Sequence, residues 1–226
     1  MKKYFILIYL NLLLTNNIAE YDIRLYNIPM AHVIINYENI ISQNKKAINL
    51  KFKTETNKIA SSIFKVDNHY ETIIDAETFN ILSFKKITYQ PGLTNEFHTI
   101  NQNNQIIYNN TNTVIPNDYF NIFSLLYYLT ITPFNKIKSN VKLEKEGVLY
   151  DCIIEKKEYK NIYEYELNFK LMKKNQHPII KNTDIFTWAI FKENSYKKIS
   201  VNKNTNIIEK CEFNFGITSL EAYIIK

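Results

Sequence analysis

The stretch YEYELNFKL, from Tyr163 to Leu171, carries an apolar side chain at every odd position and a polar one at every even position. Successive side chains of a β-strand point to opposite faces of a sheet, so this alternation predicts a long strand with one dry and one wet face. The segments Ile48–Lys53 and Cys211–Phe215 repeat the pattern. We therefore expect a sheet whose apolar face needs a cover.

Further strands are expected along most of the chain by the same pattern. They are predicted near residues 20–28, 68–75, 81–89, 95–100, 150–154, 186–190 and 196–202. Hairpin loops are predicted at Asp67-Asn68, Pro91-Gly92, 101–104, Glu146-Gly147 and 173–178. So many one-sided strands in succession indicate a mainly β fold, a curved antiparallel meander that forms an open half-barrel or a barrel-like sheet.

One segment, near residues 118–131, breaks the alternation. The run from Tyr119 to Ile131, YFNIFSLLYYLTI, follows Asn117 and Asp118, which are good helix caps, and precedes Pro133. It predicts a helix that is apolar on nearly every side, and such a helix must be buried on most faces. We expect it in the concavity of the sheet, with a second short helix near residues 57–64.

The amino-acid composition excludes several classes of function. The chain is 46% hydrophobic and 14% aromatic, which is too apolar for disorder. Its 3 Gly are isolated, so the glycine-rich loops that cradle phosphate are absent from the sequence. The net charge is +6, but the lysines are scattered among acidic residues and Arg24 is the sole arginine, which argues against nucleic acid as a partner.

The first residues resemble an export signal. Lys2 and Lys3 precede the apolar run Tyr4–Leu14, and Ala19 provides a small residue before Glu20. The run is too short to span a membrane, which takes ~20 apolar residues. We expect residues 1–19 to be a signal peptide and residues 20–226 to form a single β-rich domain, exported to the periplasm or cell envelope, with no integral membrane span in the mature chain.

The two cysteines, Cys152 and Cys211, are too far apart in sequence for a C-x-x-C unit. In an oxidising compartment they are candidates for a disulfide, and both lie on the apolar phase of their strands. Two buried free thiols explain the same residues, so both alternatives remain open from the sequence.

No motif in the sequence predicts catalysis, a metal or a cofactor. The four histidines lack metal-ligand spacing. Ser124 lies between Phe123 and Leu125 rather than in a nucleophile elbow, and Asp75 and Glu77 are typical of a turn. We therefore expect a protein that is not an enzyme, with a hydrolase as the less favoured alternative.

Three stretches together resemble a bacterial family of exported proteins described as domain of unknown function 3108. They are the turn Ile74–Phe79, the segment Asn121–Thr130 and the stretch from Trp188 to Leu220. The second of these is similar to a D-x-x-S-x-x-Y-Y-x-R pattern of the family. In addition, Tyr26–Met30 is similar to the family's opening hairpin. Asn121, Thr130 and Ser200 depart from the family's Asp, Arg and Pro. The resemblance implies an envelope-associated, mainly β protein, similar to the half-barrels of periplasmic lipoprotein carriers, and brings no known reaction.

The candidate site is the dry face of the sheet, where aromatic side chains gather. The wall is predicted to consist of Tyr163, Tyr165, Leu167, Phe169, Leu171, Phe186, Trp188 and Ile190. Such a wall is costly if exposed to water. It must be covered by the 118–131 helix, by a lipid or other apolar small molecule, or by a segment of an envelope protein. We therefore expect binding of an apolar ligand or partner segment, with a structural envelope protein of filled interior as the alternative.

Overall fold

A computed structural model describes residues 17–225 except 110, 112 and 174–177. Its strands form a 14-stranded antiparallel sheet in the order β8-β7-β6-β5-β4-β3-β2-β1-β14-β13-β12-β11-β10-β9. The first part of the sheet contains β1 (Asn17–Leu25), β2 (Ile28–Ser42), β3 (Lys45–Thr56), β4 (Asp67–Asp75), β5 (Ile81–Gln90), β6 (Leu93–Gln102), β7 (Gln105–Tyr108) and β8 (Val114–Pro116). The second contains β9 (Asn140–Lys145), β10 (Val148–Glu158), β11 (Ile162–Leu171), β12 (Tyr196–Asn202), β13 (Ile208–Phe215) and β14 (Thr218–Ile224).

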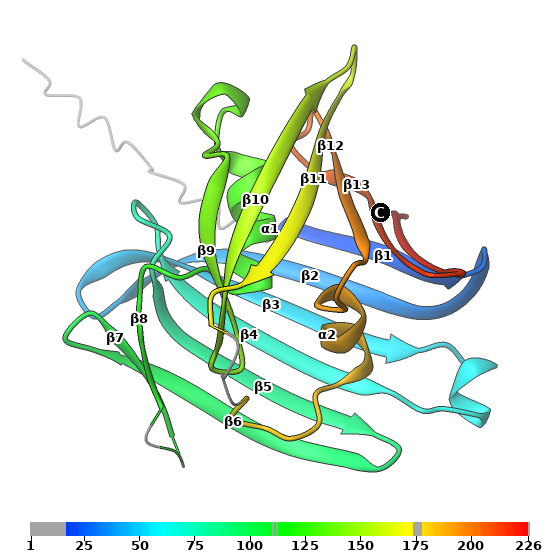
Figure 1. Ribbon diagram of the computed structural model, residues 1–226, viewed down its shortest axis with the longest axis horizontal. Coiled ribbons are helices and arrows are strands. Elements are labelled where there is room, and N and C mark those ends of the chain that lie inside the picture. The colour runs from blue at the N-terminus through cyan, green and yellow to red at the C-terminus, as the bar shows by residue number, and fades with distance from the viewer. Residues whose placement is uncertain (1–16, 110, 112, 174–177, 226) are drawn as a thin grey trace, which may run out of the picture.

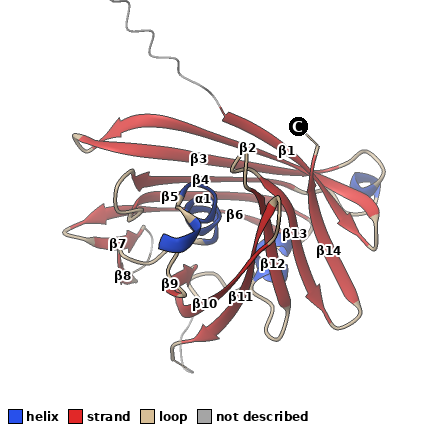
Figure 2. Cartoon of the chain, turned by 90° about the horizontal axis from the view of Figure 1, so that it is seen from above, coloured by secondary structure: helices blue, strands red, loops and turns tan. Residues whose placement is uncertain are grey.

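The sheet is a meander that curls but does not close. Strands that follow one another in sequence pair with each other, except β8 and β9. In addition β1 pairs with β14, from Tyr21 opposite Ile224 to Leu25 opposite Leu220. The edges of the sheet are β8 and β9, so it remains open between them. Figures 1 and 2 show the two arms of the sheet curling around α1. The predicted open, curved antiparallel meander is confirmed.

The helices lie inside the curl or along its rim. They are α1 (Ile122–Ile131) and α2 (Ile185–Ile190), with short 3₁₀ turns η1 (Ala60–Ser62) and η2 (Phe134–Lys136). The buried helix predicted near 118–131 is thus confirmed as α1, and the short helix expected near 57–64 is reduced to η1. The strand expected at 186–190 is wrong, because these residues form α2.

The helix α1 begins at Ile122, three residues later than predicted, because Asn121 and not Asn117 or Asp118 caps it. The Asn121 side chain accepts a hydrogen bond from Ser124 N at 2.9 Å, and Ser124 Oγ accepts one from Asn121 N at 3.0 Å, which together form a capping box. Asn121 Nδ2 also donates to Thr72 Oγ1 of β4 at 3.0 Å. The cap therefore fixes both the start of the helix and its position against the sheet.

The core consists of two apolar clusters that meet at α1. One cluster gathers residues of β9–β13 around Leu125 and Leu129, and the other gathers residues of β3–β8. Phe123 contacts both, and its ring centroid lies 4.7 Å from those of Phe52 and Tyr70. The helix thus fills much of the concavity, as expected from its apolar sequence.

Asparagine takes a role that glycine often has in tight turns. Asn27, Asn44, Asn103 and Asn104 all have positive φ in two-residue hairpin turns. Such turns match the right-handed twist of a hairpin, and asparagine tolerates this backbone conformation better than most residues. A chain with only 3 Gly can therefore still form a long meander.

Candidate functional site

An apolar cavity of about 100 Å³ lies between the inner face of the sheet, α1 and α2. It lies where β1, β2 and β14 face the two helices. Its apolar lining comes from Tyr21, Ile23, Val33, Ile35, Phe52, Tyr70, Ile122, Phe123, Leu126, Phe186, Ile190, Ile208, Cys211, Phe213, Leu220 and Ala222. Thr54, Thr187 and Glu221 also line it.

The cavity has a polar end, but the hydroxyl groups there already have partners. Tyr70 donates its hydroxyl hydrogen to Asp184 Oδ1 at 2.8 Å, and Thr187 donates to Asp184 Oδ2 at 2.6 Å. Burial and the neighbouring Asp184 carboxylate raise the pKa of Tyr70 well above its usual value. Because both hydroxyls are engaged by Asp184, this end of the cavity favours an apolar occupant over a polar one.

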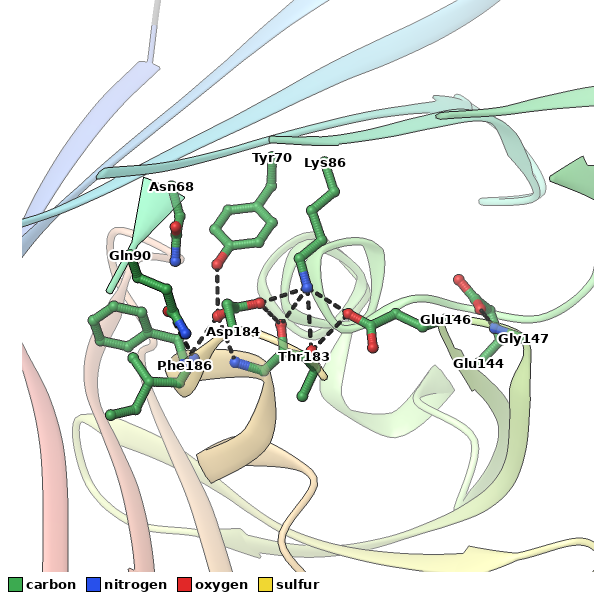
Figure 3. A network of polar contacts seen from close by, with 12 residues as sticks. Asn68, Tyr70, Lys86, Gln90, Glu144, Glu146, Gly147, Thr183, Asp184 and Phe186 are labelled. Carbon is green, nitrogen blue, oxygen red and sulfur yellow. Dashed lines mark hydrogen bonds and ion pairs between the residues drawn. The ribbon is translucent and has the colours of Figure 1, made fainter. Parts of the chain in front are cut away.

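Behind the cavity lies a network of buried charged side chains (Figure 3). Lys86 of β5 is 1% exposed and forms ion pairs with Glu146, in the β9–β10 turn, and with Asp184, at 2.5 Å. Thr183 Oγ1 donates to Glu146 Oε1 at 2.6 Å. The network therefore joins β5 in one arm of the sheet to the β9–β10 hairpin and the start of α2.

The charges of this network support one another. Burial disfavours the ammonium form of Lys86, but attraction by Asp184 and Glu146 outweighs burial and raises its pKa. Burial likewise opposes ionisation of Asp184, but the Lys86 charge and the Thr187 hydrogen bonds lower the pKa of Asp184. Lys86 is therefore held as a cation, and a cationic lysine joins Glu146 and Asp184 rather than acting as a nucleophile.

Asp184 also starts α2. Its Oδ1 accepts hydrogen bonds from Phe186 N at 2.9 Å and Thr187 N at 3.0 Å, the geometry of a helix N-cap. One carboxylate thus caps the helix, binds Lys86 and holds Tyr70, so the wall of the cavity depends on the ion network.

A second buried acid, Glu144, has a different electrostatic setting. Its Oε2 accepts hydrogen bonds from Tyr108 at 2.6 Å and from Gly147 N at 3.3 Å. Burial raises the pKa of Glu144 to about 7, with these hydrogen bonds opposing the shift. A cavity of about 20 Å³ adjoins Glu144, Glu146 and Lys86. It is large enough for one water molecule.

A buried lysine ties the end of α2 to β12. Lys197 is 4% exposed and donates to the backbone oxygens of Lys192 and Ser195, at 3.3 and 3.1 Å. Its ammonium lies 4.8 Å from the ring centroid of Phe169. Burial lowers the pKa of Lys197 to about 8. The segment after α2 is therefore held to the sheet by a cation that binds carbonyl groups.

The structure separates the predicted wall into three places. Tyr165 and Leu167 are buried in the core cluster around α1, with Tyr163 and Phe169 packed beside them. Leu171 is 43% exposed. Phe186 and Ile190 line the cavity. Trp188 is 43% exposed and leans against Phe215, with ring centroids 5.3 Å apart.

The wall was expected on one face of two neighbouring strands, and α2 changes that arrangement. Residues four apart share a face of a helix, whereas residues two apart point in nearly opposite directions. Phe186 and Ile190 therefore face the cavity together while Trp188 points outward. The β11 residues of the wall lie outside the lining of the cavity.

Of the two alternatives that the sequence leaves open for the cysteines, the structure has the free thiols rather than the disulfide. Cys152 and Cys211 are both buried and free. They lie on β10 and β13, with β11 and β12 between them. Three strand spacings of ~4.8 Å exceed the ~7 Å that a disulfide allows between Cα atoms. Burial raises the pKa of both thiols to about 12.

The other polar candidates have local structural roles. Asp75 Oδ1 accepts hydrogen bonds from Glu77 N and Thr78 N at 3.0 and 2.9 Å, which closes the β4–β5 turn. Among the described residues there is no cluster of His, Cys, Asp and Glu that could hold a metal ion. In the same part of the chain, none of the helices is both long and apolar enough to cross a bilayer.

The buried network was not predicted from the sequence, although the position of Lys86 in β5 indicated a buried charge. In β5, Leu82, Phe84 and Lys86 alternate on one face, and all of them are buried. A lysine in phase with core residues predicts a buried charge that needs a partner. The partners Glu146 and Asp184 come from distant segments, so only the fold reveals them.

Comparison with known proteins supports the fold and goes no further. No family model matches the chain, so the resemblance to domain of unknown function 3108 is not confirmed. No curated protein matches it either. A solved structure, the β-barrel-like protein of domain of unknown function DUF1849 from Brucella abortus, is similar with a TM-score of 0.51 and 11% identity. The match covers 92% of this chain and 95% of that one.

Proposed function

We propose that this chain is an exported, non-catalytic protein that binds an apolar ligand in the cavity between α1, α2 and the sheet. The observation that carries the proposal is the lining of the cavity. It is largely aliphatic and aromatic, and the hydroxyls of Tyr70 and Thr187 are committed to Asp184. Ligand sites of proteins are typically concave and mostly apolar.

The size of the cavity limits what it can take. At about 100 Å³ it is smaller than the ~150 Å³ apolar cavity that holds benzene. The end of an acyl chain or a small branched alkyl group suits this volume.

The export part of the proposal rests on the N-terminal sequence. Residues 1–16 lie outside the described residues, and Asn17–Ala19 form the start of β1.

The small volume of the cavity also supports a second candidate function, that of a structural envelope protein. Ligand pockets for drug-sized molecules usually measure ~300–1,000 Å³, and α1 fills much of the concavity. In that case the ion network and the helices serve to hold the curled sheet in shape. The two candidates differ in whether the remaining space takes up a molecule.

Filling the cavity distinguishes the two candidates. Ala222 of β14 lines the cavity, and Ala222→Leu adds an aliphatic side chain there. If the cavity takes up a ligand, the variant should lose at least tenfold in affinity for a dansyl-labelled fatty acid that octanoate displaces, with its stability unchanged or raised. In a filled interior the same change overpacks the core and costs about 1–3 kcal/mol.

The matched control is Phe169→Ala, at a partly buried residue that packs against the core cluster around α1 and lies outside the cavity lining. Phe169 packs on Phe191 with ring centroids 5.1 Å apart, so its loss should cost about 3 kcal/mol of stability. Its affinity for the probe should equal that of the wild type at temperatures well below unfolding. Absence of probe binding by the wild type would contradict the proposal and leave the structural candidate.

A further inference from the structure

Three loops at one end of the sheet hold four strongly exposed isoleucines. Ile28 follows the β1–β2 turn and is 61% exposed, and Ile217 in the β13–β14 turn is 92% exposed. Ile59 and Ile63, on either side of η1, are 81% and 86% exposed. We call these four residues the isoleucine rim. Single exposed apolar residues are ordinary on a protein surface, whereas a group of them marks an interaction site.

Hydrogen bonds place the three loops side by side. Tyr26 N donates to Ser219 O at 3.2 Å, which joins the β1–β2 turn to the start of β14 beside Ile217. Asn57 donates from its backbone to Met30 O at 2.9 Å and from its side chain to Pro29 O at 2.6 Å. Figure 1 shows these loops at the same end of the sheet. The three loops that hold the rim therefore adjoin one another at this end of the sheet.

The charged residues within the three loops have one sign, while the acidic Glu55 and Asp67 at the adjoining ends of β3 and β4 contact Lys53 and His69. In the segments 26–29, 57–65 and 216–218 the charged residues are Lys58 and Lys65, which flank Ile59 and Ile63 and are exposed. Nearby, the exposed Trp188 of α2 contacts Phe215, and the Lys192 ammonium lies 5.1 Å from the centroid of its ring. This surface combines isoleucine at loop tips, lysine beside it and tryptophan at the margin. Such a combination is typical of a surface that contacts a membrane interface.

The charge pattern argues against a second copy of the chain as the occupant. A two-fold symmetric contact brings the same surface patch together from both copies. It would gather Lys58 and Lys65 of both copies in one interface, and like charges brought together there are unfavourable. An anionic lipid surface instead attracts these lysines while its acyl region accepts the isoleucines.

We propose that the isoleucine rim docks this protein peripherally on an anionic membrane surface. The inference is independent of ligand binding in the cavity, because it rests on side chains outside the cavity lining. It also gives α2 a particular position. Trp188 faces outward beside the rim, while Phe186 and Ile190 face the cavity, so α2 separates the docked surface from the cavity.

Vesicle flotation tests the proposal. The full sequence is expressed, its N terminus is read by mass spectrometry, and partition coefficients are measured on phosphatidylcholine vesicles with and without phosphatidylglycerol. The wild type should bind the anionic vesicles, and 0.5 M salt should weaken the binding. The partition coefficient on anionic vesicles should fall at least tenfold in the rim variant Ile59→Ser/Ile63→Ser/Ile217→Ser. The variant Lys58→Glu/Lys65→Glu should no longer bind these vesicles. Comparison of variants cancels any contribution of a retained N-terminal segment.

The matched control is Ile41→Ser. Ile41 is 73% exposed near the β2–β3 turn at the opposite end of the sheet, so its replacement should leave partitioning unchanged. Circular dichroism and thermal unfolding confirm that each variant is folded. The proposal is overturned if the wild type does not bind, if the rim variant binds like the wild type, or if Ile41→Ser weakens binding equally. Dimerisation of the wild type that the rim variant abolishes would also overturn it.

Discussion

Lys86 joins the two arms of the sheet through buried ion pairs. It is 1% exposed and faces Glu146 and Asp184, which are 3% and 0% exposed. Lys86→Met leaves two buried carboxylates without their cation, and removal of one partner from a buried ion pair costs about 3–5 kcal/mol. We expect this loss in the free energy of urea unfolding.

The neighbouring Lys85 provides the control for this substitution. It lies on the opposite face of β5 and pairs with Glu96 at 3.0 Å, with both side chains about half exposed. Lys85→Met should change stability by no more than ~0.5 kcal/mol. Equal effects of the two substitutions would show that the buried network contributes nothing beyond a surface ion pair.

Glu144 predicts a pH dependence with a definite sign. Its pKa is raised from 4.5 to about 7 in the folded protein, so between these values the folded state binds more protons than the unfolded chain. Stability should therefore fall as the pH rises through this window. Glu144→Gln keeps the acceptor for Tyr108 and removes the charge. The free energy of unfolding of the variant should therefore exceed that of the wild type by on the order of 3 kcal/mol at pH 8.

At pH 5 the free energy of unfolding of this variant should be close to that of the wild type, because Glu144 is largely protonated in the folded protein at that pH. Urea unfolding of both proteins at pH 5, 6, 7 and 8 gives the comparison. Parallel stability curves over this range would contradict the raised pKa of Glu144.

At the scale of elements, the cap of α1 is the local feature with the clearest energetic consequence. Asn121 caps the helix and donates to Thr72, and both contacts are buried. Asn121→Ala removes the cap, which costs ~1 kcal/mol, and leaves Thr72 without its donor. We expect a total loss of about 2 kcal/mol in chemical unfolding, and a loss below 0.5 kcal/mol would mean that the cap does not position the helix.

The two helices were not equally predictable from the sequence. The run Tyr119–Ile131 is long, lacks alternation and precedes Pro133, so α1 was predicted, although its cap is Asn121 rather than Asn117 or Asp118. The segment of α2 is short, and its apolar residues at 186, 188 and 190 alternate as a strand would. The helical signal was Asp184, whose carboxylate caps Thr187 three residues later. The cap also explains why Trp188 does not join Phe186 at the cavity.

At the scale of the molecule, alternation predicted the sheet but could not place its closing contacts. The strand at Tyr163–Leu171 and the hairpin at Glu146–Gly147 follow from local pattern and turn chemistry. The pairing of β1 with β14, and the meeting of Lys86 with Asp184, join residues far apart in the chain. Only the curl of the sheet brings them together, and for that reason the cavity was expected against β11 and lies instead beside β1, β2 and β14.

Methyl NMR with octanoate tests the central claim most directly, because it reports where an apolar ligand sits. In protein labelled at isoleucine, leucine and valine methyl groups, octanoate should shift the signals of Ile23, Val33, Ile190 and Leu220, which line the cavity. The signals of Leu143 and Leu167, buried elsewhere in the core, should stay in place. Absence of shifts, or shifts confined to Leu167 and Leu171 of β11, would contradict the account.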